Sequence, residues 1–395
     1  MEIIVQALEK EWSTVAVFLD LSKAFDKVDF SILLSILAHF GFGDPLIRLI
    51  HSFLHGRQQY VFLMQNGKEY RSSFRSPTCS VPQGSILGPL LFLLYINWLP
   101  ILAGIEDVCM FCDDTTLIFK NSCPRENEIN LYVSLNNYVQ WLSCLNLSVN
   151  IGKTKFINFK RSVRSDNSNV NAYLASEEIE QVQHLKFLGV CIDEQLTWNN
   201  HITHLLSKLS SALFVLNRIS KVCALSTRLM TYHSVFHSHI SYCILLWGST
   251  SEMNLLEVFR CQKKALRATL HLKRNEPCKV HFQEHKIFTV YAQYVYQLLL
   301  KIKQNECVLS SVGESHHYNT RNGHLLRLQQ NKLKIKSNLP AQAGIGYFNL
   351  LPKPISSLNM SAFKRKMKTE LLALAPYSLD EVKKCLPTLK LDKNK

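Results

Sequence analysis

The sequence lacks an apolar run long enough to cross a membrane. The longest such run, ILGPLLFLLYI at 86–96, falls short of the roughly 20 residues that a spanning helix needs. The sequence also has no N-terminal leader and no low-complexity stretch, and its twelve cysteines are scattered without regular spacing. These absences exclude a membrane-spanning or disulfide-stapled protein. We expect a soluble, intracellular chain of two or three globular domains with no membrane partner, and leave open whether it is nuclear or cytoplasmic.

Few residues have the spacing of a metal site. His233/His237 and His281/His285 share the i, i+4 spacing of one helix face, which could hold a metal ion. No third ligand is identified beside either pair. We therefore interpret these histidines as ordinary helix-surface or core residues.

The net charge of +15 is distributed unevenly. Residues 1–160 hold 13 Lys and Arg against 14 Asp and Glu, whereas residues 161–395 hold 32 against 16. A basic half of this kind favours a polyanionic partner, nucleic acid before membrane. The alternative is a solvated basic surface that only keeps the chain in solution.

Apolar periodicity predicts an α+β fold for the first half. The predicted helices are 30–40, 45–54 and 127–146, together with a long apolar helix that the Pro-Gln-Gly turn opens within 79–100. The predicted strands include 13–21 and 154–159. Asn66–Gly67 is a strong turn signal between two alternating strands, and a second hairpin is expected to turn at Asp113–Asp114. This order of elements indicates a mostly antiparallel sheet with helices on one face.

The second half is predicted to be helical, and one of its helices has a basic face. We expect helices at about 200–220, 226–247 and 252–271. Four cations recur at i, i+3, i+4 and i+7 in the last of them: Arg260, Lys263, Lys264 and Arg267. We favour a nucleic-acid-binding face, although a charge stripe is by default a solvated surface.

Three carboxylates are candidates for a metal site. Asp20 ends a buried strand, and Asp113 and Asp114 lie at a hairpin turn, so neighbouring strands could bring all three to one sheet edge. Buried carboxylates need a positive partner, and Mg²⁺ takes a few carboxylates together with water and substrate phosphates. A polar hairpin turn with no metal is the competing interpretation.

Five ordered motifs carry a family resemblance. They are VAVFLDLSKAFDKVD, SVPQGSILGPLLFLLYIN, FCDDTTLIF, LNLSVNIGKTKFINF and KFLGVCIDEQLTW. Their order and spacing resemble polymerase motifs A to E in reverse transcriptases of non-LTR (LINE-type) retrotransposons, most similar to the jockey/CR1 type. The C-terminal YNTRNGH and LPKPISSLNMSAFKRKM also resemble the tail of those reading frames.

The resemblance implies a role for each matched residue. Asp20, Asp113 and Asp114, with the Leu21 carbonyl, would coordinate two Mg²⁺ or Mn²⁺ ions. The implied nucleotide-binding residues are Phe25, which would exclude a ribose 2′-hydroxyl, and Pro82, Gln83 and Gly84. Lys153 would be catalytic beside the pyrophosphate leaving group, and Leu188, Gly189 and Val190 would form the primer grip.

The resemblance also implies a fold and a domain order. We expect a right-hand polymerase palm at 1–183, a primer-grip hairpin with a helical thumb at 184–271, and a basic, mostly helical region at 272–395. Only about a dozen residues precede the strand that bears Asp20. We therefore expect an N-terminally truncated family member with fingers largely absent, for which a partner chain could supply fingers or an endonuclease.

Two functions remain open at this point. The first is an RNA-directed DNA polymerase that joins a dNTP to a DNA primer on an RNA template. The second is a truncated, catalytically inactive element remnant that only binds nucleic acid. The motifs also depart from the family pattern: Ser80 replaces a usual glycine, Cys112 a common alanine and Trp98 a usual aspartate. We expect Ser80 and Cys112 to be tolerated and Trp98 to alter the palm surface.

Overall fold

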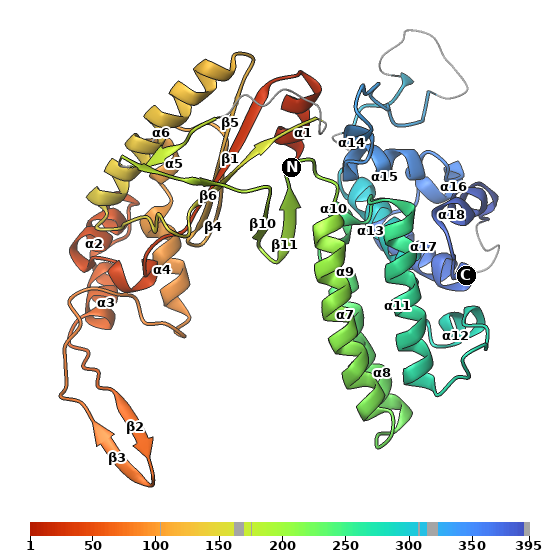
Figure 1. Cartoon of the computed structure of the whole chain (residues 1–395), viewed down its shortest axis with the longest axis horizontal. Helices are drawn as coiled ribbons and strands as arrows, with labels where there is room; N and C mark the ends of the chain where they lie inside the picture. The colour runs from red at the N-terminus through yellow and green to blue at the C-terminus, as the bar shows by residue number, and fades with distance from the viewer. Residues whose placement is uncertain (103, 162–169, 175, 307–308, 314–322, 391–395) are drawn as a thin grey trace. The chain divides into compact units, whose positions relative to one another are not determined.

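The computed structural model describes residues 1–102, 104–161, 170–174, 176–306, 309–313 and 323–390 (Figure 1). By its internal contacts the chain divides into two compact units, Ile3–Gln183 and His184–Lys395. Most of the YNTRNGH tail motif, 318–322, lies outside the described residues.

The first unit is built on a five-stranded sheet of order β4-β5-β1-β6-β9. Its strands are β1 (Ser13–Leu19), β4 (Val108–Phe111), β5 (Asp114–Asn121), β6 (Lys155–Phe159) and β9 (Glu180–Gln181). The first four pair antiparallel, and β9 joins β6 in parallel. The expected mostly antiparallel sheet is therefore confirmed.

The central strand, β1, is buried over nearly its whole length, as its continuous apolar sequence predicts. Alternate residues of a strand point to opposite faces. Val15, Val17 and Leu19 accordingly join one core cluster with residues of the helices that cover one face of the sheet.

The first unit's helices overlap the predicted ones, but the long helix expected within 79–100 is wrong in extent, since the structure has a helix at 87–96 and a separate short one at 99–102. The helices of this unit are α1 (Glu2–Glu9), α2 (Phe30–His39), α3 (Asp44–Leu54), α4 (Leu87–Ile96), α5 (Leu99–Leu102) and α6 (Pro124–Cys144), with the 3₁₀ turn η1 at Ala24–Lys27. The side chain of Asp29 caps α2 by accepting hydrogen bonds from the N–H groups of Ser31 and Ile32.

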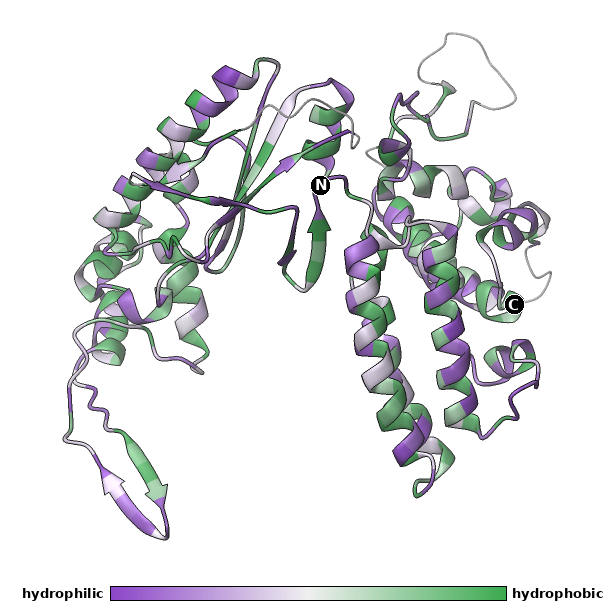
Figure 2. Ribbon diagram, viewed as in Figure 1, coloured by the Kyte–Doolittle hydropathy of each residue, from purple (hydrophilic) through white to green (hydrophobic). Residues whose placement is uncertain are grey.

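The hairpin predicted at Asn66–Gly67 is confirmed. It consists of β2 (Phe62–Gln65) and β3 (Lys68–Arg71), and both turn residues have positive φ. Figure 2 shows one hydrophobic and one mainly hydrophilic strand. All residues of both strands are exposed. Two short strands, β7 (Tyr173–Leu174) and β8 (Glu177–Glu178), form a further hairpin.

Trp98 lies just beyond α4 and is partly covered by α2. Its ring stacks on Phe40 with centroids 5.7 Å apart and meets His39 edge-on at 6.2 Å. The side chain remains 37% exposed. The departure from the family pattern at this position is therefore accommodated by aromatic packing at the palm surface.

Ser80 has a backbone conformation that favours glycine. Its φ is +99°, while its N–H donates to the Val28 carbonyl at 2.9 Å and its carbonyl accepts from Arg57 at 3.0 Å. A non-glycine residue is strained at such a φ, and these two contacts hold the backbone in place.

We expect Ser80→Gly to stabilise the chain by about 1 kcal/mol, because glycine removes the Cβ that causes the strain. Urea unfolding of the full chain measures this effect. Ser80→Ala is the matched control, since alanine keeps the Cβ and should give no gain. A lower midpoint for Ser80→Gly than for wild type would contradict the assignment of strain.

The second unit begins with a hairpin and continues as helices. Its strands are β10 (His184–Phe187) and β11 (Val190–Asp193). The longer helices are α7 (Asn199–Ile219), α8 (Leu225–Thr231), α11 (Glu252–Leu270), α13 (Val290–Gln304), α15 (Pro340–Phe348) and α17 (Met360–Leu374). The shorter ones are η2 (Tyr232–His237, π), α9 (Ser238–Ser241), α10 (Ile244–Trp247), α12 (Lys279–Glu284), α14 (Lys334–Ser337), α16 (Lys353–Ser356), α18 (Leu379–Cys385) and η5 (Leu386–Thr388). None of the helices in the described part of the chain is long and apolar enough to cross a membrane.

The single helix predicted at 226–247 is wrong. The structure breaks it at Tyr242, which is extended, and at Cys243, which has a φ of +50°. The break is held by side-chain contacts: the Trp247 indole donates to the Tyr242 carbonyl at 2.9 Å, and the Tyr242 hydroxyl donates to the Leu188 carbonyl at 2.6 Å. The apolar periodicity of 226–247 does not reveal the break, because the Tyr242 contact is to Leu188, 54 positions earlier in the sequence.

The regions 184–271 and 272–395 pack together. Helix α11 of the first region contacts α13 of the second. Both regions belong to the same compact unit. The boundary between them at 271 stays a prediction.

Candidate active site

The three aspartates lie at adjoining strand ends in the first unit. The β1–β5 pairing ends with Leu19 opposite Thr115. Asp20 follows Leu19 and Asp114 precedes Thr115, so both aspartates lie at that end of the sheet. The β4–β5 hairpin closes at Phe111 and Asp114, with Cys112 and Asp113 as its turn. The predicted turn at Asp113–Asp114 is therefore wrong by one residue, because Cys112 adopts the positive φ, +57°, that this turn needs.

The charges of the three carboxylates act on one another. Burial, followed by the charges of Asp113 and Asp20, raises the pKa of the Asp114 carboxyl. All three residues are half-buried. The site therefore concentrates negative charge where solvent only partly screens it, as a cation-binding site would.

Lys153 supplies a positive charge at this site. Its Nζ lies 3.7 Å from Oδ2 of Asp20, and its side chain is 70% exposed. The loop that carries it is tied to β1 because the Asn150 N–H donates to the Asp20 carbonyl at 2.7 Å. Thr154 adds a long contact of 3.5 Å between its hydroxyl and the Asp20 N–H. Sequence reasoning did not single out Asn150 or Thr154, although both lie in the motif LNLSVNIGKTKFINF.

The donor set fits hard divalent cations, which prefer carboxylate oxygens. The oxygens of the three aspartates do not gather within 4.8 Å of one another; within the described residues only His281, Glu284 and His285 meet that condition. Asp20, Asp113 and Asp114 would hold the ions that the family uses. Leu21 is buried and pairs with Val149 through an isolated antiparallel bridge, and the role of its carbonyl as a ligand stays a prediction.

The predicted nucleotide-binding residues form one connected surface beside the aspartates' strand. Phe25 stacks on Phe92 of α4 with ring centroids 4.4 Å apart, and its carbonyl accepts from the Val81 N–H at 3.0 Å. The Gln83 amide donates to the Asp26 carboxylate at 3.1 Å. These contacts join the segment after β1 to the P-Q-G turn. Asp26 was not identified from the sequence.

Gly84 is exposed and has a φ of +82°. No heavy atom lies within 4 Å of the position a Cβ would take there. Glycine is therefore required at this turn by the backbone conformation and not by crowding within the chain. Pro82, two residues before Gly84, is half-buried, and its carbonyl accepts a hydrogen bond from the Ser85 hydroxyl at 2.7 Å.

The predicted primer-grip residues form the tight turn of the β10–β11 hairpin in the second unit. Leu188 and Gly189 are its two central residues, both with positive φ, and Val190 is buried. The Tyr242 hydroxyl holds this turn through the Leu188 carbonyl. Tyr242 carried no signal in the sequence, because the contact spans 54 positions.

The four cations of the basic stripe on α11 differ in their surroundings. Arg260 and Lys264 are exposed. Lys263 lies over the rings of Phe259 and Tyr377, and Arg267 donates to the Glu276 carbonyl at 3.2 Å. Two of the four are thus free to meet a phosphate directly, and two are engaged within the unit.

Comparison with known proteins gives matches over the part of the chain that carries these motifs. Residues 3–192 match the model of the family described as reverse transcriptase (RNA-dependent DNA polymerase). The RNA-directed DNA polymerase from mobile element jockey of Drosophila funebris is 29% identical over 66% of this chain and 29% of its own. The probable RNA-directed DNA polymerase from transposon X-element of Drosophila melanogaster is 26% identical over 68% of this chain and 29% of its own. The chain thus spans about three tenths of the length of these relatives.

One solved structure, apo telomerase from Candida tropicalis, is similar with a TM-score of 0.37 and 13% identity, over 74% of this chain and 50% of that one. The family model and the curated relatives confirm the resemblance that the ordered motifs suggested.

Proposed function

We propose, on the premise that residues 3–192 match the reverse transcriptase family, that the chain is an RNA-directed DNA polymerase of the non-LTR retrotransposon type. It would join a dNTP to the 3′-hydroxyl of a DNA primer paired with an RNA template. The observation that carries the proposal is the position of Asp20, Asp113 and Asp114 at adjoining strand ends, with Lys153 beside Asp20. A separate chain could complete the nucleotide site.

The reaction is an in-line phosphoryl transfer. The primer oxygen forms a bond to the α-phosphorus of the dNTP while the bond to pyrophosphate breaks. Two Mg²⁺ or Mn²⁺ ions, when bound, would orient the attacking and leaving oxygens and neutralise their charge. Asp20, Asp113 and Asp114 would hold these ions. The three aspartates support the proposal because, without a cation, their carboxylates would repel one another at these adjoining strand ends.

The other residues of the site would position the substrates. Phe25, fixed by its stack on Phe92, would offer its exposed part to the sugar of the dNTP, and Gln83 and Gly84 would leave room for the base pair. Lys153 would neutralise or protonate the leaving pyrophosphate, because its ammonium group is exposed and lies next to Asp20. The turn at Leu188–Gly189 would support the primer strand.

Nucleic acid would be bound chiefly through the phosphate backbone. The second half of the chain carries 32 Lys and Arg against 16 Asp and Glu, and on α11 Arg260 and Lys264 are exposed. Contacts of this kind release counterions, so affinity for an RNA–DNA hybrid should fall linearly with salt on a logarithmic scale. They carry little information about base sequence.

The second candidate is a chain that binds nucleic acid without polymerising, and the basic second half of the sequence supports it. Primer extension on poly(rA)/oligo(dT) with Mg²⁺ or Mn²⁺, together with a salt-titrated hybrid-binding assay, separates the two. Extension with salt-sensitive binding is the expected result. Binding without extension would favour the second candidate, and neither binding nor extension would overturn both.

A further inference from the structure

A group of side chains in the last turn of α12 and at its C-cap has the composition of a metal site that the polymerase chemistry does not use. His281, Glu284 and His285 each place one potential ligand atom within 4.8 Å of the others. The sequence interpretation of this histidine pair missed the third ligand, Glu284, which lies between the two histidines in the chain. The i, i+3, i+4 spacing is the signal that could have found it, because those positions share one face of a helix.

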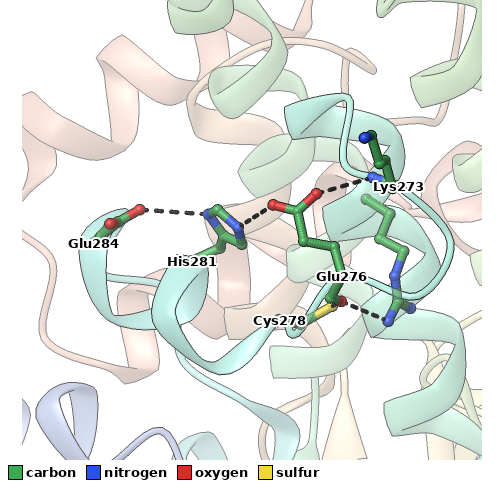
Figure 3. Close-up of polar contacts among 6 residues, drawn as sticks. Lys273, Glu276, Cys278, His281 and Glu284 are labelled. Carbon is green, nitrogen blue, oxygen red and sulfur yellow. Dashed lines mark hydrogen bonds and ion pairs between the residues drawn. The ribbon is translucent and has the colours of Figure 1, made fainter.

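The contacts of His281 are compatible with a metal ligand. Its Nε2 lies 2.9 Å from Oε1 of Glu276, and its Nδ1 lies 3.4 Å from Oε2 of Glu284 (Figure 3). A neutral imidazole donates from only one ring nitrogen. If Nε2–H donates to Glu276, the lone pair of Nδ1 faces a carboxylate oxygen, which is repulsive unless a cation lies between them. Either a proton on Nδ1 or a metal ion removes this repulsion.

Glu276 is itself held in place. Its Oε2 accepts from the Lys273 N–H at 3.1 Å, and its backbone carbonyl accepts from Arg267. A carboxylate that fixes the far nitrogen of a ligating histidine is the usual outer partner of a zinc ligand, since it orients the ring and selects the tautomer. Figure 3 shows His281 between Glu276 and Glu284 in this arrangement.

We infer that His281, Glu284 and His285 form a binding site for a borderline divalent transition ion, Zn²⁺ or a similar ion such as Co²⁺, with Glu276 as the outer carboxylate. Two imidazole nitrogens and one carboxylate oxygen suit such an ion better than they suit Mg²⁺, which prefers oxygen ligands alone. Glu284 is 59% exposed on its side chain, so the fourth coordination position is open to water. Binding would link α12 to the turn at Lys273–Glu276 and would not depend on the polymerase reaction.

The test is metal binding to the tag-free full chain after chelator treatment. Titration with Co²⁺ should give the visible absorption of a four-coordinate ion at one equivalent per chain, and Zn²⁺ should displace it. His281→Ala and His285→Ala should abolish the signal, and Glu284→Gln should weaken it. Glu276→Gln should lower affinity by about 10- to 100-fold while leaving the ligands themselves intact.

Two controls match these substitutions. His184→Ala removes an exposed histidine, and Glu257→Gln an exposed glutamate on α11, and neither should change binding. Circular dichroism of each metal-free variant verifies that it is folded. The inference is overturned if wild type binds no Co²⁺ at one equivalent. It is likewise overturned if the variants at His281 and His285 bind as wild type does, or if Glu276→Gln has no effect on affinity.

Discussion

Asp113→Asn and Asp114→Asn are each expected to lower primer extension by about 10³-fold, the scale of loss when a preorganised charged group is removed from a reaction centre. Neither variant should unfold the chain. The pKa of the Asp114 carboxyl is raised by burial and by the charges of Asp113 and Asp20, so its ionised form is disfavoured in the folded state. Replacing it with a neutral amide should raise the midpoint of unfolding at pH 7.

The sign of the pH dependence follows from the same shift. Because the folded-state pKa of Asp114 lies above the unfolded one, the folded protein takes up a proton more readily. The destabilisation by this group is therefore present at neutral pH and disappears as the pH falls through the raised pKa. Asp114→Asn should lack this component of the pH dependence.

Primer extension and urea unfolding at several pH values measure these two effects. Asp44→Asn is the matched control, because Asp44 is exposed in the first turn of α3, away from the strand ends, and its loss should alter neither extension nor stability appreciably. Hybrid binding should survive in all three variants, since it depends on cations elsewhere. Full extension by Asp113→Asn would refute the assignment of that residue to the reaction centre.

Asp193→Ala is expected to destabilise the second unit by about 4 kcal/mol. Asp193 ends β11, is 7% exposed, and its carboxylate accepts hydrogen bonds from the backbone N–H groups of Gln195, Thr197 and Trp198 at 3.2, 2.9 and 3.0 Å. Alanine leaves these three donors without their acceptor in a largely buried turn. Hydrogen bonds to a charged acceptor are worth more than neutral ones, and unsatisfied buried donors add their desolvation cost.

Tryptophan fluorescence during urea unfolding measures this effect, because Trp198 is buried at the turn itself. Asp193→Asn is the milder variant and should cost less, since its amide keeps one acceptor oxygen for the same donors. Asp380→Ala is the control: Asp380 is exposed and makes one ion pair, to Lys383 at 3.5 Å, so its loss should change stability by less than about 0.5 kcal/mol. An Asp193→Ala midpoint equal to that of wild type would contradict the role of this carboxylate.

Much of the first unit could be predicted because its signals are local. The apolar run of β1 marks a buried strand, Asn66–Gly67 marks a turn, and Asp29 can cap only the helix that follows it. The meeting of Asp20 with the Asp113–Asp114 hairpin was also predicted, because adjacent antiparallel strands bring the end of one to the start of the other. The misplaced turn shows the limit: which residue takes a positive φ depends on strand register.

The sequence by itself determined the buried strand β1, the Asn66–Gly67 hairpin, most of the helices and the order of the motifs, since each rests on residues a few positions apart. Only the tertiary structure decided the break at Tyr242–Cys243, the engagement of Lys263 and Arg267 within the second unit, and the contact of His281 with Glu276. Each of these depends on which side chains fill the space beside it. That neighbourhood is fixed by packing between elements distant in the sequence, and no periodicity along the chain records it.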